Sequence, residues 1–292
     1  MLIALAKLLL TGTERESHTD SLHRLQNAFL SSGWDVVTVS HDELSFDHGR
    51  LRYMRNGRPV ADPAAFDWVW LLGFGGRSTF LDRMQLLHSV DQSKFVNSIN
   101  AFLLFQNKAT LAMTTLSKYA PSTIVSANTE ELANHVRRGG LWIAKPTAGS
   151  FGRDVFELHA NDPNLNQILE HLTRNDYAIL QERVETSQEQ RWFVAMGKEL
   201  GAYRKVKSGL RGNVRASSSA ATCDPETQER EMVRSIALEL FELGIRACAI
   251  DIAYPYLLDV NFVNPGWFQT MEHLTGTDYA KRLPTLFEAT PL

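Results

Sequence analysis

Two carboxylates and an amide stand among apolar residues in the stretch AIDIAYPYLLDVNFVNPG, residues 249–266: Asp251, Asp259 and Asn261. The flanking residues predict two short strands on either side of residues 253–256. If these strands pair, Asp251 lies opposite Asp259, and Asn261 shares that face because strand side chains alternate. Opposed like charges destabilise a sheet unless a cation lies between them. Three hard oxygen ligands suit Mg²⁺, which binds proteins together with substrate phosphates.

The alternative for this stretch is that Asp251 caps a turn while Asp259 and Asn261 face water. We weigh it lower, because such apolar strands usually bury one face and a buried unpaired carboxylate pair is costly.

A second stretch, KPTAGSFGRDV at 145–155, has the composition of an anion-binding loop. Lys145 stands at a strand end, and Gly149, Ser150 and Gly152 follow before the next strand. Glycines let backbone N–H groups approach an anion, and the lysine adds a charge. The alternative is a plain turn with a solvated lysine. Further anion-binding candidates recur downstream: Arg191, Arg204, Lys205, Arg211 and Asn213.

Composition describes an ordinary globular chain of 292 residues, 44% hydrophobic and 22% charged. A net charge of -3 argues against a nucleic-acid surface. Cys223 and Cys248 lack metal-ligand spacing and are too few for a disulfide scaffold, which favours a reducing cytoplasm. No apolar run reaches the length of a membrane span, and the opening MLIALAKLLL is interpreted as a buried strand rather than a signal segment.

The order of elements predicts an α/β (α+β) chain. Up to about residue 95, strands alternate with helices, which is typical of a small parallel sheet. Beyond it, short strands at close intervals predict antiparallel sheet. In the first part we expect strands at 2–10, 34–40, 66–74 and 94–98, a helix with Leu22, Leu25, Phe29 and Leu30 on one face that stops at Gly33, a hairpin at 50–60 closed by Asn56-Gly57, and a helix at 79–89. Helices are also expected at 101–116 and at 225–244, with Pro225 in the first turn of the latter and Gly244 at its end.

From about Asn97 to Gly276 the sequence resembles the ATP-grasp fold, specifically the glutathione synthetase-like and RimK-like carboxylate–amine ligases. Six segments carry the resemblance in the family's order: FVNSINAFLLFQNKATLAMTTL, WIAKPTAGSFGRDV, ILQERV, EQRWFVAMGKELGAYRKV, LRGNVRAS and IDIAYPYLLDVNFVNPGW. It implies three domains: an N-terminal small parallel α/β domain at 1–95, a central ATP-grasp subdomain with the glycine-rich loop at 96–184, and a C-terminal subdomain with the metal hairpin at 185–292.

The resemblance also implies roles for single residues. Lys108 and Lys145 would bind ATP phosphates under a loop containing Gly149, Ser150 and Gly152. Gln181, Glu182 and Val184 would form the hinge at adenine, and Glu189 would bind the ribose. Arg191, Arg204, Arg211 and Asn213 would face the γ-phosphate and the acyl group, and Asp251, Asp259 and Asn261 would hold one or two Mg²⁺, with Mn²⁺ as an alternative. Two departures from the family pattern stand out. Asp259 stands where the family usually has Glu, which bears on the bridging of two metal ions. VRASSSA follows Asn213 in place of a Gly-Gly pair, in a loop that helps shape the substrate site.

The implied reaction is ATP-dependent formation of an amide through an acylphosphate. The substrates would be a small-molecule or peptide carboxylate and an amine, with addition of an amino acid such as glutamate to a cofactor or peptide as one version. A homo-oligomer is expected from the family. The alternative function is an ATP-binding module without ligase activity, a sensor or scaffold.

The loop GFGGR at 73–77 raises a third interpretation, a dinucleotide site, but it lacks the required glycine order. We expect this loop to line the acceptor site instead, with Arg77 as a carboxylate clamp. A flexible connection with a solvated arginine is the alternative.

Overall fold

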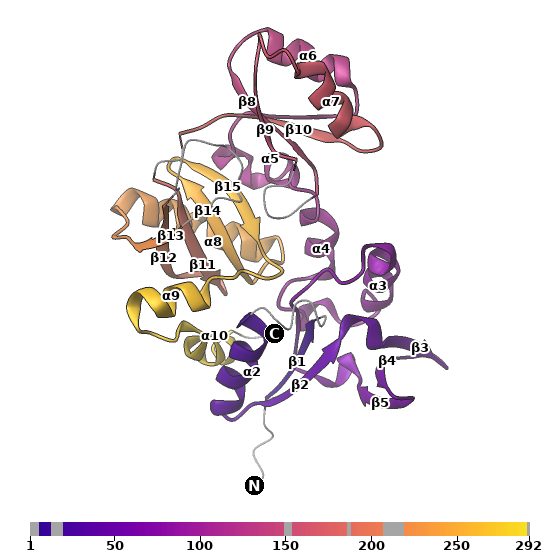
Figure 1. Cartoon of the computed structure of the whole chain (residues 1–292). Coiled ribbons are helices and arrows are strands. Elements are labelled where there is room, and N and C mark those ends of the chain that lie inside the picture. Colours follow the sequence, from indigo (N-terminus) through magenta and orange to yellow (C-terminus); the bar gives the residue numbers. More distant parts are fainter. Residues whose placement is uncertain (1–5, 13–19, 149–153, 186–187, 207–218, 291–292) are drawn as a thin grey trace.

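The fold was analysed in a computed structural model that describes residues 6–12, 20–148, 154–185, 188–206 and 219–290. Three layers of structure follow one another from bottom to top in Figure 1: the N-terminal sheet, a five-stranded sheet, and a smaller lobe around β8 and β10. None of the helices in the described ranges is long and apolar enough to cross a membrane.

The N-terminal sheet is parallel, as predicted. Its order is β2-β1-β6, formed by β1 (Lys7–Gly12), β2 (Asp35–Ser40) and β6 (Trp68–Leu71). The helix α2 (Asp20–Ser31) follows β1, and Gly33 comes after its end with a φ of 84° that suits glycine. Leu30 was expected on the buried face but is 47% exposed. It adjoins the fully buried Phe29, and successive helix residues point about 100° apart.

A separate antiparallel sheet joins β3 (Leu44–Asp47), β4 (Arg50–Arg55) and β5 (Arg58–Ala61). Its hairpin turns at Asn56 and Gly57, both with positive φ, as predicted. The helix α3 (Phe80–Leu87) lies within the range predicted for it.

The strand predicted at 94–98 is wrong. Residues Gln92–Lys94 form a short 3₁₀ helix, and the following backbone divides its bonds between two partners. Val96 donates to the carbonyl of Val69 in the N-terminal sheet, whereas Ser98 donates to the carbonyl of Gly244. The segment therefore links two parts of the molecule and builds no ladder of its own.

The single helix predicted at 101–116 is also wrong. The chain forms α4 (Ile99–Phe105), α5 (Thr110–Met113) and a 3₁₀ turn (Thr115–Tyr119). In the interruption, the Asn107 side chain accepts a hydrogen bond from the Ala109 N–H, and the Lys108 N–H donates to the carbonyl of Thr147 at 2.7 Å. These bonds compete with the helical ones and end α4.

The smaller lobe is an antiparallel sheet with two helices on one face. Its order is β7-β10-β8-β9, and α6 (Thr129–Arg137) and α7 (Leu165–Thr173) cover it. The strands are β7 (Thr123–Ser126), β8 (Leu141–Pro146), β9 (Phe156–His159) and β10 (Ala178–Glu182). The buried residues of its core all lie between 132 and 180.

The five-stranded sheet is antiparallel with the order β13-β12-β11-β14-β15. Its strands are β11 (Gln190–Ala195), β12 (Lys198–Val206), β13 (Ser219–Thr222), β14 (Ala247–Ala253) and β15 (Tyr256–Asn261). The long helix α8 (Thr227–Glu242) begins after its N-cap Glu226, so Pro225 precedes the cap rather than lying in the first turn. Gly244 follows its end, as predicted.

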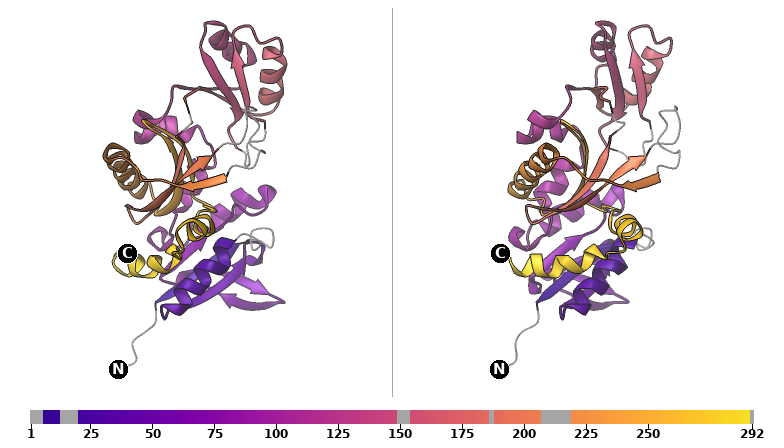
Figure 2. Two further views of the ribbon diagram at one scale, coloured as in Figure 1. Left: turned by 60° about the vertical axis from the view of Figure 1, so that its left-hand side comes forward. Right: turned by 90° about the vertical axis from the view of Figure 1, so that its left-hand side faces the viewer.

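The last helices, α9 (Phe268–Thr275) and α10 (Leu283–Glu288), return toward the N-terminal sheet (Figure 2). Phe287 of α10 is buried, with its ring 5.0 Å from Trp68, 5.2 Å from Phe29 and 5.6 Å from Trp70. Buried residues of the N-terminal and five-stranded sheets belong to common clusters, so these two sheets share their core.

Candidate active site

Arg191, Asp251 and Asp259 lie side by side on three neighbouring strands. In the strand register Arg191 pairs with Asp251, and Asp251 pairs with Asp259, as the sequence predicted for the hairpin. The Arg191 guanidinium clamps Asp251 with two hydrogen bonds of 2.7 Å, from Nε to Oδ1 and from Nη2 to Oδ2. The Asn261 amide also donates to Asp251 Oδ2, at 3.3 Å.

Lys205 of β12 lies next to Arg191 and Asp251, and these residues together with Asp259 and Lys108 form a charged cluster. The Lys205 Nζ lies 2.8 Å from Asp251 Oδ2 and 2.7 Å from Glu189 Oε1. Glu189, expected to bind a ribose, thus also holds Lys205.

Arg204, expected beside Arg191, lies on the opposite face of the sheet. It pairs with Gln190, whose side chain donates to Glu229 of α8, whereas Arg191 pairs with Tyr203. Because strand side chains alternate, the face of Arg191 receives Tyr203 and Lys205 and excludes Arg204. Lys205 therefore lies on the face of Arg191 and Arg204 does not, while the role expected of Arg204 stays a prediction.

Lys108 approaches the hairpin from the interruption between α4 and α5. Its Nζ lies 2.9 Å from Asp259 Oδ2. The hydrogen bond from the Lys108 N–H to Thr147 anchors the same residue to the segment that follows β8. Lys108 therefore bridges the smaller lobe and the carboxylate hairpin.

Lys145 comes from the sheet of the smaller lobe. Its Nζ donates to Gln181 Oε1 at 2.9 Å, and Gln181 in turn donates to Thr123 at 3.1 Å. On β8 and β10, Ala144 and Leu180 point into the core under α6 and α7, so alternation places Lys145 and Gln181 on the other face. Gln181 thus orients this lysine, and its expected place at an adenine hinge stays a prediction.

The charge on Lys145 is coupled electrostatically to Asp259 of the hairpin and to Lys108. Burial lowers the pKa of Lys145 to about 8; the charge of Asp259 opposes this shift and that of Lys108 adds to it. Burial would raise the pKa of Asp251, but the hydrogen bonds and charges of Arg191 and Lys205 outweigh it, so this pKa lies below its usual value. The carboxylate repulsion expected from the sequence is thus already offset by protein cations.

Other predicted site residues are only partly placed. Gly149, Ser150, Gly152, Arg211 and Asn213 lie outside the described residues. Glu182 is exposed, and its N–H donates to the carbonyl of Ser122, while Val184 is half-buried just beyond β10. Their roles at adenine stay predictions.

The hairpin offers oxygen donors that suit a divalent cation. Two carboxylates and an amide stand on one face of β14 and β15, while the described residues contain no group of three or more His, Cys, Asp or Glu able to hold a metal alone. Further oxygens would have to come from a bound molecule such as a nucleotide, and Mg²⁺ is commonly shared with phosphates in this way.

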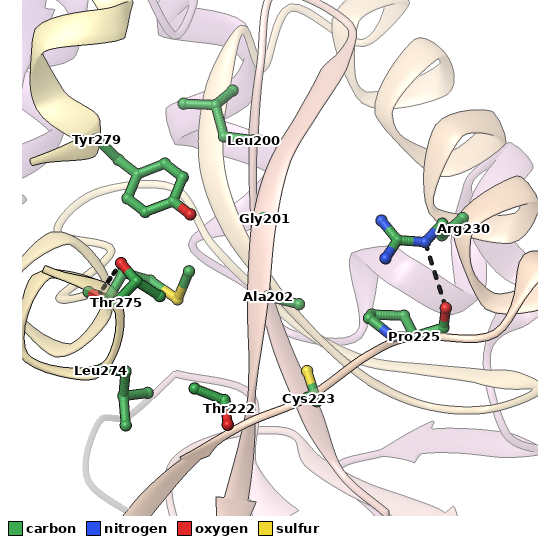
Figure 3. Close-up of a pocket in the computed structure, with 11 residues that line it drawn as sticks. Leu200, Gly201, Ala202, Thr222, Cys223, Pro225, Arg230, Leu274, Thr275 and Tyr279 are labelled. Atoms are coloured by element: carbon green, nitrogen blue, oxygen red, sulfur yellow. Dashed lines mark hydrogen bonds between the residues drawn. The ribbon is translucent and has the colours of Figure 1, made fainter. Parts of the chain in front are cut away.

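A cavity of about 290 Å³ lies elsewhere, along the edge of β12 that β13 leaves open (Figure 3). Arg230 is the charged side chain among the described residues that line it, and its Nε donates to the carbonyl of Pro225 at 3.2 Å. None of the carboxylates and lysines described above lines this cavity, so we place the candidate site at the cluster.

Sequence reasoning missed the individual contributions of Lys205, Thr123 and Asn107. Lys205 was noticed as basic, but choosing between it and Arg204 requires the register of β11 and β12. Thr123 and Asn107 carry no distinctive sequence signal. Thr123 accepts a hydrogen bond from Gln181, which orients Lys145, and Asn107 accepts one from the Ala109 N–H beside Lys108.

Comparisons with known proteins identify a family and a fold. The family model described as "Prokaryotic glutathione synthetase, ATP-grasp domain" matches residues 109–276. A glutathione synthetase of Thermosynechococcus vestitus is 28% identical over 163 residues, 54% of this chain and about half (51%) of that protein. A glutathione synthetase of Neisseria meningitidis serogroup A is 25% identical over 302 residues, 91% of this chain and 92% of that protein.

Solved structures show the same fold. A RimK domain ATP-grasp protein from Sphaerobacter thermophilus superposes with a TM-score of 0.66 and 18% identity, covering 97% of this chain and all of that one. The expected fold class, a mixed α/β ATP-grasp fold after a small parallel sheet, is confirmed.

Proposed function

Since this chain belongs to the ATP-grasp family of prokaryotic glutathione synthetases, we propose that it is an ATP-dependent carbon–nitrogen ligase that joins a carboxylate to an amine. The observation that supports the proposal is a cluster of charged side chains from two parts of the molecule. Lys108 and Lys145 approach from the side of the smaller lobe, and Arg191, Lys205 and the two aspartates from the five-stranded sheet.

The cluster suits a triphosphate together with a cation. Lys108, Lys145, Arg191 and Lys205 carry four positive charges against three carboxylates, those of Glu189, Asp251 and Asp259. We propose that Lys108 and Lys145 bind the ATP phosphates, Lys108 exchanging its contact with Asp259 for a phosphate oxygen. Charge-assisted hydrogen bonds of this kind are among the stronger polar contacts.

The proposed reaction proceeds in two displacements. The substrate carboxylate attacks the γ-phosphorus, the bond to ADP breaks, and an acylphosphate forms. The amine then attacks the acyl carbon, inorganic phosphate leaves, and the amine loses a proton as the amide forms. Arg191 and Lys205, held by Asp251, would offset the negative charge that develops in both steps, without a side-chain nucleophile.

Mg²⁺ would be held by Asp251, Asp259 and Asn261, and its chemistry would be charge neutralisation at the phosphates. We expect Asp259→Asn to lower turnover by about 10²–10³-fold, the usual cost of one preorganised electrostatic contact. The variant should not gain stability, since it also removes the ion pair with Lys108. Turnover at saturating Mg-ATP and a metal-free melting curve check this; near-normal turnover would end the metal proposal.

A screen of ADP release tests the function. Amino acids and short peptides, glutamate among them, are offered in pairs with Mg-ATP, and products are identified by mass spectrometry. We expect ADP and amide in equal amounts for one pair, and strongly reduced release by Lys145→Ala. ATP binding in calorimetry without ADP release from any pair would favour the alternative, an ATP-binding module that does not ligate.

A further inference from the structure

The loop at residues 73–79 lies at the carboxyl end of β6, the edge of a parallel sheet where ligands usually bind. Leu72, just before it, donates its N–H to the carbonyl of Thr11 on β1. The loop contains Gly73-Phe74-Gly75-Gly76-Arg77. None of these residues belongs to the cluster of lysines, arginine and aspartates described above.

Arg83 of α3 fixes the backbone of this loop from inside the protein. Its side chain is only 5% exposed, and its Nη2 donates to the carbonyls of Phe74 at 2.7 Å and Gly76 at 3.3 Å. Gly75 has a φ of 64°, and a Cβ there would lie 2.5 Å from Arg83 Nη2. A Cβ at this position would therefore displace the guanidinium, and the positive φ also favours glycine.

Phe74 fixes the loop against the hairpin of the candidate site. Its ring makes edge contacts with Phe262 at 5.7 Å and with Phe102 at 5.8 Å. Phe262 directly follows Asn261, so the position of the loop is tied to that of the proposed metal ligands.

Arg77 projects from this fixed loop toward the smaller lobe. Its side chain is 82% exposed, and its Nη2 lies 3.8 Å from Asp176 Oδ2, two residues before β10. An exposed pair at this distance contributes little to stability. The exposed guanidinium of Arg77 is instead available to bind an anion, and the carboxylate of Asp176 in the smaller lobe lies beside it.

We propose that Arg77 binds the side-chain carboxylate of an acidic residue in the substrate, a carboxylate that the reaction does not consume, and that Arg83 is the positioning residue that holds Arg77 for it. Asp176 is then an internal competitor that the substrate carboxylate displaces. This rests on the proposed ligase function and narrows its substrates to acidic amino acids or peptides that end in one.

The two partners of the Arg77–Asp176 pair distinguish recognition from structure. With an acidic substrate, Arg77→Ala should raise KM about tenfold, the loss expected for one charge-assisted contact. Asp176→Asn should lower KM about two- to threefold, since it removes a competitor of a weak exposed pair. A merely structural ion pair predicts that both variants shift KM in the same direction, and that result would overturn the proposal.

Substrates are offered as acid–amide pairs, glutamate against glutamine, free and in dipeptides. We expect the acid to be preferred by wild type and the preference to vanish in Arg77→Ala. Arg83→Gln should raise KM like Arg77→Ala, and Arg83→Lys should restore part of it, while the KM for ATP stays unchanged. Arg58→Ala, an exposed arginine of β5, is the control and should behave as wild type. Equal use of acid and amide by wild type would refute the inference.

Hydrogen exchange separates this inference from the ligase proposal. L-glutamate, but not L-glutamine, should protect the amides of residues 73–79 in the wild type in the presence of Mg-ADP, and not in Arg77→Ala. Protection without any ADP release would refute ligation and keep the anion site. If glutamate does not protect these amides even at ten times the concentration used for glutamine, the anion site is refuted.

Discussion

Two adjacent basic residues of β12 have opposite environments. Lys205 bonds to Asp251 and Glu189, whereas Arg204 faces α8. We expect Lys205→Ala to reduce kcat about 10²–10³-fold, because it removes a preorganised charge from the reaction centre, and Arg204→Ala to stay within about threefold, like an ordinary change outside the site. Steady-state ADP release measures both, with melting curves as the folding control. Comparable losses in the two variants would contradict the register argument.

The buried Lys145 makes ATP binding depend on pH. Its pKa of about 8 in the free protein means that the ammonium form, which binds phosphate, is lost as pH rises through 8. The affinity for ATP should therefore be nearly constant from pH 6.5 to 7.5 and fall above pH 8, approaching tenfold per unit. Calorimetry at constant ionic strength measures this. Lys145→Arg stays charged over the whole range, and an equal decline in that variant would exclude Lys145 as the titrating group.

At the scale of single residues, the sequence identified types better than contacts. The spacing of Asp251 and Asp259 was sufficient to predict their pairing, because period-two alternation leaves little choice within a short hairpin. It could not indicate that Arg191 and Lys205 already neutralise Asp251, or that Gln181 orients Lys145, since these contacts join strands distant in sequence.

Among the elements, the interruption between α4 and α5 has a direct consequence for the site. Asn107 stabilises it by accepting the Ala109 N–H, and Lys108 leaves the helix there to reach Asp259. We expect Asn107→Ala to weaken ATP binding about fivefold, since it removes about 1 kcal/mol from the interruption and alanine favours a continuous helix. Titration with ATP measures the effect, and Gln106→Ala is the neighbouring control. Unchanged affinity would mean that tertiary contacts alone hold Lys108.

Element prediction succeeded where one face is apolar and failed where polar contacts break a pattern. The strands β2 and β6 and the helices α3 and α8 lie within their predicted ranges. The range 101–116 is apolar enough for one helix, but a bond from Lys108 to Thr147, far along the chain, interrupts it. The segment 94–98 has the composition of a strand but forms only isolated bridges, from Phe95 to Val69 and from Asn97 to Ile245.

For the whole molecule, α10 connects the end of the described chain to the first sheet. Phe287 contacts the rings of Phe29, Trp68 and Trp70. We expect Phe287→Ala to lower the free energy of unfolding by about 3–5 kcal/mol, as for other buried aromatics. Denaturant titration followed by tryptophan fluorescence measures this, and Thr285→Ala on the exposed side of α10 is the control. A loss below about 1 kcal/mol would show that the sheet is complete without the helix.

The sequence indicates the fold class of the whole chain more clearly than it indicates the domain boundaries. The smaller lobe has its own core, but the N-terminal and five-stranded sheets share theirs, and composition does not reveal a shared core. The boundaries at 95/96 and 184/185 and the expected homo-oligomer stay predictions.

The return of α10 to the N-terminal sheet also affects how the protein is made. Residues 7–71 are translated long before α10, so Trp68 and Trp70 obtain Phe287 as a neighbour only after more than two hundred further residues have been translated. During this time the nascent sheet exposes aromatic surface that chaperones recognise and that promotes aggregation. A lower growth temperature or a larger supply of chaperones should therefore raise the yield of this protein. The gain should exceed that for a protein whose N-terminal domain completes its core without a C-terminal helix.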